Sequence, residues 1–355
     1  MKITILGAGG FIGSHLVDHL LARGEHEVVG LDVADEKLNG SRHHPGLSFH
    51  LADIRSAPEL VDELISRSDI VFDLVAYANP SLYVTSPVEV FDLNFMQNLR
   101  IAQSCMKHDA RLIQFSSAEV YGKAIEGKHY NEETTDVVFG PVNKQRWIYA
   151  TAKLLLDRVL YAHGAAGNLD YTIIRPFNFI GSRIDYLVPP GSMGGPRVFA
   201  HFLSALLGNG PMYLVDGGNV HRAFLHIADA MDAMQTILDR PDESRNQIFN
   251  VGNPENNVTI RELAELMLAM YEELTGESPE SRLEEVSGEE FYGLGYEDSD
   301  RLPPDISKMN ALGWCPRRDL WITLRDAMGY YLEPGCEERR QVTPVRVLDS
   351  LTVTL

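Results

Sequence analysis

The chain has 355 residues, of which 45% are hydrophobic and 23% are charged, and this composition is typical of a folded protein rather than a disordered one. The length favours two domains over one. A formal net charge of −19 argues against nonspecific binding to nucleic acid or to an anionic membrane, so an anionic ligand would need a local basic pocket.

The N-terminal residues lead directly into a predicted strand, and no apolar run approaches the roughly 18 residues of a membrane span. We therefore expect no signal peptide, no membrane partner and a cytoplasmic location. The cysteines Cys105, Cys315 and Cys336 are far apart and form no CxxC pair. This spacing predicts neither a disulfide framework nor a zinc site, so we expect no metal.

A glycine-rich loop separates the first predicted strand, residues 3–6, from a helix predicted over 14–23. Glycines in such a loop let the backbone turn tightly and approach a pyrophosphate, which then lies at the amide groups of the helix N-terminus. The residues that we expect to bind a dinucleotide here are Gly7, Gly10, Phe11, Ile12 and Gly13.

The second predicted strand, residues 27–31, ends in Asp32. A carboxylate at this distance from the glycine loop accepts hydrogen bonds from the adenosine ribose and repels a 2′-phosphate, so NAD is favoured over NADP. A third strand ends near Asp53 and Ile54, where Asp53 either reaches the adenine or caps a helix. A fourth strand, residues 70–76, brings Ala76 to the same edge of the sheet.

Strands and helices alternate through the first half of the chain. The remaining elements are a helix over 89–107, a strand over 111–115, a helix that carries Lys153 and a strand over 171–175. This alternation predicts an α/β fold with a doubly wound parallel sheet.

Candidate reactive groups gather around the strand at 111–115. Ser117 and Glu119 follow this strand, and Tyr149 and Lys153 are four residues apart, so they share one face of a helix. A neighbouring ammonium favours the ionised form of a phenol, which suits a general base. Because open α/β sheets bind ligands at the carboxyl ends of their strands, we expect these groups to meet there.

The amino-acid composition and the pattern of predicted elements change at Gly181. A Gly- and Pro-rich loop over 181–196 is followed by shorter predicted elements and by a polar, acidic stretch over 276–304. We expect a dinucleotide-binding domain over 1–180, a smaller domain over 181–334 that interleaves with it, and a tail over 335–355.

Several of these segments carry a resemblance to a known family. They are the glycine loop with Asp32, the Tyr149/Lys153 pair and the segments 116–122, 140–149, 175–178, 215–218, 251–256 and 291–300. Together they resemble the extended short-chain dehydrogenase/reductases that act on nucleotide sugars, above all the UDP-glucuronate decarboxylase half of the bifunctional polymyxin-resistance enzyme and the UDP-apiose/UDP-xylose synthases. The resemblance implies a Rossmann-type sheet, a smaller C-terminal α/β substrate domain, NAD, a UDP-sugar substrate and a homodimer.

The resemblance also implies roles for individual residues. Tyr149, helped by Lys153, would remove the proton of the sugar 4-hydroxyl while hydride passes from C4 to the nicotinamide, and Ser117 would hold the 4-oxygen. Glu119 would assist the step that follows oxidation. The residues that would line the UDP-sugar site are Ala78, Tyr83, Arg146, Asn178, Arg197, Tyr213, Arg222 and Tyr296. Among them, Arg222 suits the diphosphate because a guanidinium binds phosphate oxygens in pairs.

Two positions depart from the decarboxylases and leave alternatives open. Those enzymes carry serine or cysteine in place of Ala118 and arginine in place of Leu302, although a local slip would let Arg301 meet the substrate carboxylate. The cysteines of the apiose-forming synthases correspond to Ala78 and Ala118, which speaks against apiose formation. The alternatives are therefore oxidative decarboxylation of UDP-glucuronate, or a 4-epimerase, 5-epimerase or dehydratase acting without loss of CO2. A third alternative is an inactive NAD-binding protein, against which the intact reactive set argues.

Overall fold

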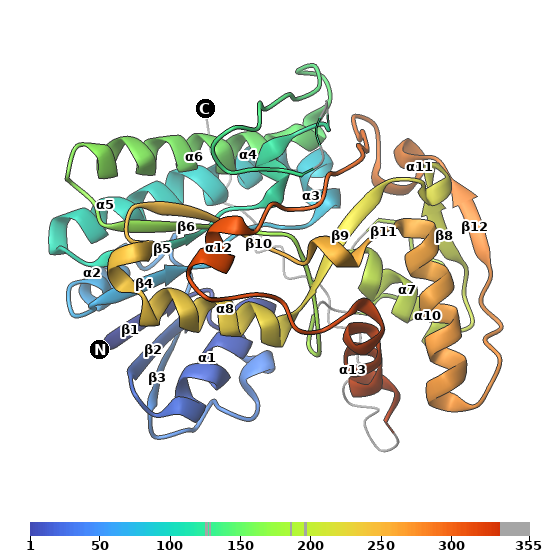
Figure 1. Ribbon diagram of the computed structural model, residues 1–355, viewed down its shortest axis with the longest axis horizontal. Helices are drawn as coiled ribbons and strands as arrows, with labels where there is room; N and C mark the ends of the chain where they lie inside the picture. Colours follow the sequence, from blue (N-terminus) through green and yellow to red (C-terminus); the bar gives the residue numbers. More distant parts are fainter. Residues whose placement is uncertain (125–126, 128, 185–186, 195–196, 334–355) are drawn as a thin grey trace.

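The computed structural model describes residues 1–124, 127, 129–184, 187–194 and 197–333, so the tail expected over 335–355 lies outside it (Figure 1). Its main feature is a seven-stranded sheet in the order β10-β6-β5-β4-β1-β2-β3, with every neighbouring pair parallel. The strands are β1 (Lys2–Leu6), β2 (Glu27–Asp32), β3 (Leu47–Leu51), β4 (Ile70–Asp73), β5 (Arg111–Phe115), β6 (Tyr171–Pro176) and β10 (Gln247–Val251). This is the doubly wound α/β sheet that the sequence predicts.

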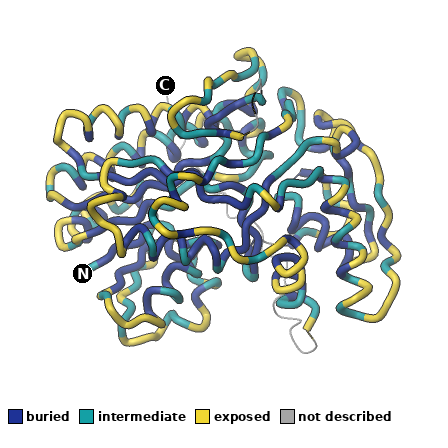
Figure 2. Tube along the Cα trace, in the orientation of Figure 1, coloured by how far each residue is buried: buried dark blue, intermediate teal, exposed yellow. Residues whose placement is uncertain are grey.

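Helices cover both faces of this sheet. The helices are α2 (Pro58–Ile65), α5 (Asn98–His108) and α6 (Ile148–Ala165) on one face, and α1 (Phe11–Arg23) and α8 (Ile227–Asp239) on the other. Neighbouring residues of a strand serve different faces, as Ile5 and Leu6 of β1 do. Both faces are therefore buried, which explains the nearly continuous apolar strands of the sequence and the dark central strands in Figure 2.

The helix predicted over 89–107 is a rod with an irregular centre. It consists of α4 (Pro87–Phe91), a π-helical segment η2 (Asp92–Gln97) and α5, and it follows α3 (Pro80–Thr85). Asn94, in the π-helical segment, accepts a hydrogen bond from the Tyr77 amide at 2.8 Å and donates one to the Tyr77 carbonyl at 3.1 Å. The buried asparagine thereby fixes the chain just beyond β4, where it borders the cavity described below.

The second half of the chain builds a smaller α/β layer beside the sheet (Figure 1). Its strands are β7 (Asn178–Ile180), β9 (His221–His226) and β11 (Asn257–Thr259) in one sheet, and β8 (Met212–Val215) and β12 (Leu283–Val286) in another. Its helices are α7 (Val198–Leu207), α10 (Ile260–Thr275), α11 (Gly288–Tyr292) and α13 (Leu320–Leu332), whereas α9 (Pro241–Ser244) and α12 (Ser307–Ala311) lie against β5 and β10 of the large sheet. Thr259 and Glu262 form the capping box at the start of α10. Since β10 and α8 return to the large sheet, the two halves interleave.

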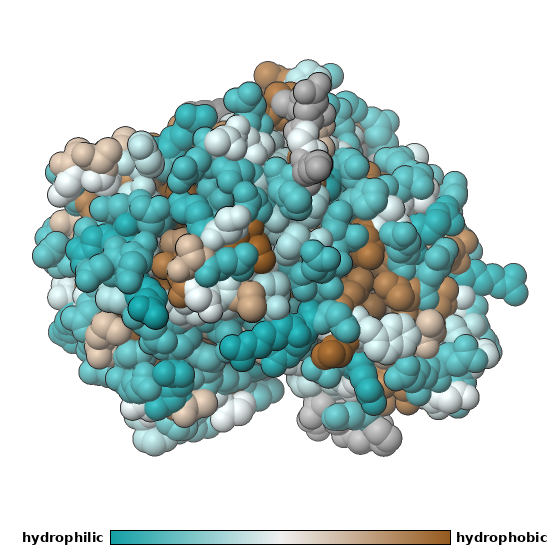
Figure 3. Space-filling model, viewed as in Figure 1, coloured by the Kyte–Doolittle hydropathy of each residue, from teal (hydrophilic) through white to brown (hydrophobic). Residues whose placement is uncertain are grey.

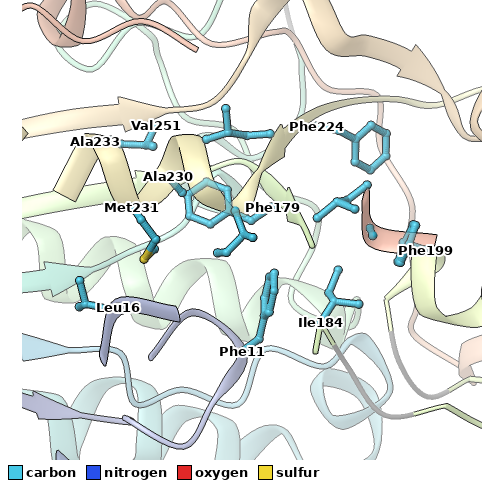
Figure 4. Packing of buried hydrophobic residues seen from close by; sticks show 14 of the residues in the cluster. Phe11, Leu16, Phe179, Ile184, Phe199, Phe224, Ala230, Met231, Ala233 and Val251 are labelled. Carbon is cyan, nitrogen blue, oxygen red and sulfur yellow. The ribbon is translucent and has the colours of Figure 1, made fainter. Parts of the chain in front are cut away.

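One apolar core runs between the two halves. Phe11 at the start of α1 packs in the same cluster as Phe179 of β7, Phe199 of α7 and Ala230 of α8 (Figure 4). A Cβ atom on Gly181 would lie 2.3 Å from Ile227, so only glycine fits where β7 leaves this core. The face shown in Figure 3 is mostly hydrophilic. Within the described residues, no helix is both long and apolar enough to span a membrane.

Candidate active site

A cavity of about 490 Å³ lies between the carboxyl ends of the sheet strands and the second half of the chain. This is where ligands bind in open α/β folds. Most of the residues predicted for the site line this cavity. They are Gly7, Gly10, Phe11, Ile12, Gly13, Ala76, Ala78, Tyr83, Ser117, Glu119, Arg146, Tyr149, Asn178, Arg197, Tyr213, Arg222, Tyr296 and Arg301. Four predicted residues do not: Asp32, Asp53, Ile54 and Lys153.

The glycine loop has the geometry that a dinucleotide needs. Gly7 has a φ of +89°, and a Cβ atom on Gly13 would lie 2.0 Å from the Gly7 carbonyl oxygen, so side chains at these positions would disrupt the turn. Helix α1 starts after Gly10 without a capping side chain, which leaves its first-turn amides available to an anion. Asp32 lies behind the loop and accepts a hydrogen bond from the Gly9 amide at 2.9 Å. These residues fit NAD.

Asp53 and Ile54 lie apart from the cavity. Arg55 pairs with the Asp53 carboxylate at 2.7 Å, and the Arg55 amide donates to the same carboxylate at 2.9 Å. Burial would raise the pKa of Asp53, but the hydrogen bonds from Arg55 outweigh it and lower the pKa. Ile54 is packed in the core between the sheet and α2. The structure therefore places Asp53 in a turn before α2, whose N-cap is Ala57, so Asp53 does not cap that helix.

Ser117 and Tyr149 lie together in the lining of the cavity. Ser117 caps η3 (Ala118–Tyr121) by accepting the Glu119 amide at 3.1 Å, and Tyr149 lies in the first turn of α6. The ring of Tyr83 stacks on that of Tyr149 with 4.7 Å between centroids. Burial raises the pKa of Tyr149 to about 12, and a hydrogen bond with Ser117 offsets only part of this rise. The phenol is therefore protonated in the free enzyme.

Lys153 shares the helix face of Tyr149, as predicted, but its ammonium is engaged elsewhere. Its Nζ donates to the Phe115 carbonyl at 2.9 Å, and the charges facing it are Asp73 and Asp157. Lys153 is not among the groups that shift the pKa of Tyr149, on which burial has the largest effect, so a role of Lys153 toward the phenol stays a prediction. Burial also lowers the pKa of Lys153, and the two carboxylates oppose that shift.

A carboxylate between two arginines is the strongest electrostatic feature of the cavity. Glu119 Oε2 accepts from Arg146 Nη1 at 2.5 Å and from Arg301 Nη2 at 2.8 Å. Burial would raise the pKa of Glu119, but the two guanidinium groups hold it well below its usual range. Arg301 is only 6% exposed, and its Nη1 has no hydrogen-bond partner among the described residues. A buried, unsatisfied donor of this kind favours an anionic ligand.

The residue after Arg301 points into a different environment. Leu302 packs with Tyr121 and Tyr130 in a small apolar cluster. Beyond it, the Tyr130 amide donates to the Pro303 carbonyl at 2.9 Å, and the Asp305 amide donates to the Tyr130 carbonyl at 2.8 Å. These bonds fix the register of the segment, so Arg301 rather than position 302 supplies the guanidinium.

Arg222 also lines the cavity, with a partner that the sequence reasoning missed. Its Nη2 donates to Asp298 at 2.7 Å and its Nη1 donates to the Ser299 carbonyl at 3.2 Å. Other lining residues without a predicted role include His201, Phe291 and Tyr292. Phe291 and Tyr292 lie at the start of the segment 291–300. The many aromatic and acidic residues of this segment are the feature of the sequence that could have indicated a binding role for them.

The cavity thus combines a dinucleotide loop with Ser117, Tyr149 and four arginines. The model of the NAD dependent epimerase/dehydratase family matches residues 3–252, which is more than half of the chain. The chain belongs to this family; it is an enzyme, and NAD is its cofactor.

The chain is also similar to individual proteins over nearly its whole length. The chain is 40% identical to UDP-D-apiose/UDP-D-xylose synthase 2 of Arabidopsis thaliana, over 97% of this chain and 94% of the relative. It is 40% identical to UDP-D-apiose/UDP-D-xylose synthase of Oryza sativa subsp. japonica, over 93% of this chain and 89% of the relative. Among solved structures, PbgP3 protein from Burkholderia pseudomallei superimposes with a TM-score of 0.86 and 33% identity, over 97% of this chain and 99% of that one.

Proposed function

We propose that the enzyme oxidises UDP-glucuronate at C4 and then removes its C6 carboxylate as CO2. The observation that carries this proposal is Arg301, a buried guanidinium beside Glu119 whose Nη1 has no partner among the described residues. A uronic acid supplies the carboxylate that such a donor needs, whereas a neutral sugar would leave it unsatisfied. The names of the plant relatives, which are UDP-D-apiose/UDP-D-xylose synthases, support a UDP-sugar.

In the first step, Tyr149 removes the proton of the 4-hydroxyl and Ser117 hydrogen-bonds to the 4-oxygen. NAD held by the glycine loop would supply the hydride acceptor for C4. Since the phenol has a pKa of about 12 in the free enzyme, positive charge must favour its ionised form in the loaded site. Arg197 already acts in this direction, and Lys153 lies one helical turn away on the same face.

In the second step, the new C4 ketone makes the acid a β-keto acid. The C5–C6 bond breaks, CO2 leaves, and the electron pair of that bond delocalises into the ketone as an enolate, which is then protonated at C5. Arg301 orients the carboxylate for this cleavage. Glu119 remains ionised because the arginines depress its pKa, so it holds Arg301 and Arg146 in place and accepts hydrogen bonds rather than donating a proton.

The remaining site residues are proposed to bind the two nucleotides. NAD would be held by the glycine loop, with Asp32 toward its ribose and Ala76 beside it. Arg222 would contact the diphosphate after exchanging Asp298 for phosphate oxygens. The residues proposed to line the rest of the UDP-sugar site are Ala78, Tyr83, Asn178, Arg197, Tyr213 and Tyr296.

One observation favours a second candidate. Ala118 lines the cavity beside Glu119 and supplies no hydroxyl, thiol or acid near the sugar. An epimerase that oxidises and reduces C4 without losing CO2 needs no further group at that position. A dehydratase is disfavoured, because it would need an acid there.

We further propose the division into an NAD-binding domain over 1–180 and an interleaved UDP-sugar domain over 181–334, and a homodimer built on the helices α4, α5 and α6. These helices and η2 carry exposed apolar side chains, including Met96, Leu155 and Tyr161 at 40%, 41% and 59% exposure. Sedimentation analysis tests the dimer, and a monomer at micromolar concentration would rule it out.

The decisive experiment is to incubate the enzyme with UDP-glucuronate and NAD, and to follow the reduced-nicotinamide absorbance and the product mass together. Loss of CO2 supports the proposal. Net NADH then indicates a released 4-keto-pentose, and no net NADH indicates UDP-xylose. An unchanged mass with an altered NMR spectrum would instead establish an epimerase.

A further inference from the structure

We infer that Trp147 and Glu297 form a positioning pair that sets Arg146 and Arg301 for the sugar carboxylate. Neither Trp147 nor Glu297 is among the described residues that line the cavity, so we assign the pair a positioning role. The inference rests on the proposed function, because it assigns to this pair the preference for an acidic sugar over a neutral one.

The indole of Trp147 lies among cationic groups. Its ring centroid is 4.5 Å from the Arg146 guanidinium carbon, 5.7 Å from that of Arg301 and 5.9 Å from Lys123 Nζ. Cations within about 6 Å of an aromatic centroid are attracted by the ring. Trp147 is 4% exposed, which strengthens these attractions because little water screens them. The ring therefore reduces the repulsion between the guanidinium groups of Arg146 and Arg301, which both donate a hydrogen bond to Glu119 Oε2.

Glu297 fixes the position of this ring. Its Oε2 accepts from Trp147 Nε1 at 2.7 Å, and its Oε1 accepts from Lys123 Nζ at 2.7 Å. The contact passes directly over Gly140, where a Cβ atom would lie 2.3 Å from Glu297 Oε2 and 2.5 Å from Trp147 Nε1. Glycine at position 140 is thus a requirement of the Trp147–Glu297 contact.

The contact joins the two chain segments that carry the arginines. Trp147 follows Arg146 in η4 (Gln145–Trp147), which leads into α6 and Tyr149, while Glu297 lies four residues before Arg301 in the segment between α11 and α12. Beyond Arg301, that segment is held separately by the hydrogen bonds between Tyr130 and residues 303 and 305. Removing the contact should therefore shift Arg301 relative to Arg146 without releasing the segment.

A second ion pair, between Lys144 just before η4 and Glu289 of α11, offers a matched control. Lys144 and Glu289 lie 3.5 Å apart with side chains 30% and 53% exposed, and neither contacts the arginines in any described bond. An exposed pair of this kind contributes little. Glu289→Met should therefore leave both stability and sugar preference nearly unchanged.

The test compares Trp147→Phe, which keeps a ring but loses the donor, and Glu297→Met, which loses the acceptor, with Glu289→Met. Dissociation constants for UDP-glucuronate and UDP-glucose are measured by calorimetry on NAD-loaded enzyme. Loss of a hydrogen bond to a charged group should lower the preference for the acid by roughly 10-fold or more. The affinities for UDP-glucose and NAD should hold, and the double variant should be no worse than either single variant, because both remove one contact.

The outcomes separate this inference from the proposed function. A wild-type enzyme without preference for UDP-glucuronate would overturn the proposed substrate and the inference with it. A wild-type preference that persists in Trp147→Phe and Glu297→Met would overturn the positioning pair alone. Equal loss of both sugars and of NAD would also overturn it, since that pattern indicates damage to the fold.

Discussion

Replacing Arg301 with methionine is the most direct perturbation of the proposed carboxylate site. Methionine keeps an unbranched side chain of moderate length but removes the guanidinium that meets Glu119 at 2.8 Å. Glu119 retains Arg146 at 2.5 Å, so its charge is not left without a partner. The substrate carboxylate, by contrast, loses Arg301 Nη1, a donor that has no partner among the described residues.

The magnitude follows from these contacts. A hydrogen bond to a charged group is worth about 1.5–3 kcal/mol, which corresponds to roughly 10- to 150-fold in kcat/KM for UDP-glucuronate. Thermal stability should change little. Burial and the charges of Arg146 and Arg222 all lower the pKa of Arg301, so the folded protein gains little from ionising this group.

The assay is CO2 release from UDP-glucuronate in Arg301→Met and in Leu302→Met. Leu302 packs in an apolar cluster, and methionine conserves its volume, so this neighbouring variant should keep near wild-type activity. Unchanged CO2 release in Arg301→Met would refute the assignment of the carboxylate to Arg301. An equal loss of affinity for UDP-glucose would show that Arg301 serves binding in general.

Three further predictions concern the reactive tyrosine, the coenzyme and alkaline pH. Tyr149→Phe should abolish hydride transfer, seen as loss of the reduced-nicotinamide absorbance change, while NAD still binds; persisting turnover would remove Tyr149 as the base. Asp32→Ala should weaken NAD binding and relax discrimination against NADP, and a variant that still excludes NADP would contradict the ribose assignment. Burial raises the pKa of Tyr121 and Tyr149 to about 12, above the ordinary tyrosine value of about 10, so the folded state retains protons that the unfolded chain loses. Stability should therefore be full below about pH 10 and fall as the pH rises toward 12; a flat profile in thermal unfolding between these values would disprove the effect.

Most of the fold could be predicted from local sequence patterns, because the order of apolar and polar residues determines which side chains are buried. The apolar strands predict a sheet covered on both faces, and the glycines at 7, 10 and 13 predict the turn that a dinucleotide needs. The π-helical segment at 92–97 could not be predicted, because it coincides with hydrogen bonds between Asn94 and the backbone of Tyr77, 17 residues earlier in the chain. A tertiary contact of this kind leaves no periodic signal in the sequence.

The same reasoning explains where site prediction failed. Spacing correctly placed Tyr149 and Lys153 on one helix face, but spacing alone does not reveal that the Lys153 ammonium donates to the Phe115 carbonyl or that burial dominates the pKa of the phenol. Asp298 was missed because its role depends on its contact with Arg222, 76 residues away in the chain. The tail over 335–355 and the cytoplasmic location remain predictions.

The slip between Arg301 and Leu302 shows what the structure adds to an alignment. In sequence, the arginine is one position early and an additional proline follows, so a decarboxylase site looks incomplete. In the structure, the Pro303 carbonyl accepts the Tyr130 amide at 2.9 Å, and this bond fixes the chain after the arginine. With that anchor, Leu302 turns into the apolar cluster and Arg301 reaches Glu119. The shift in sequence therefore preserves the guanidinium, and Ala118 is the departure that a test of the decarboxylase proposal must still explain.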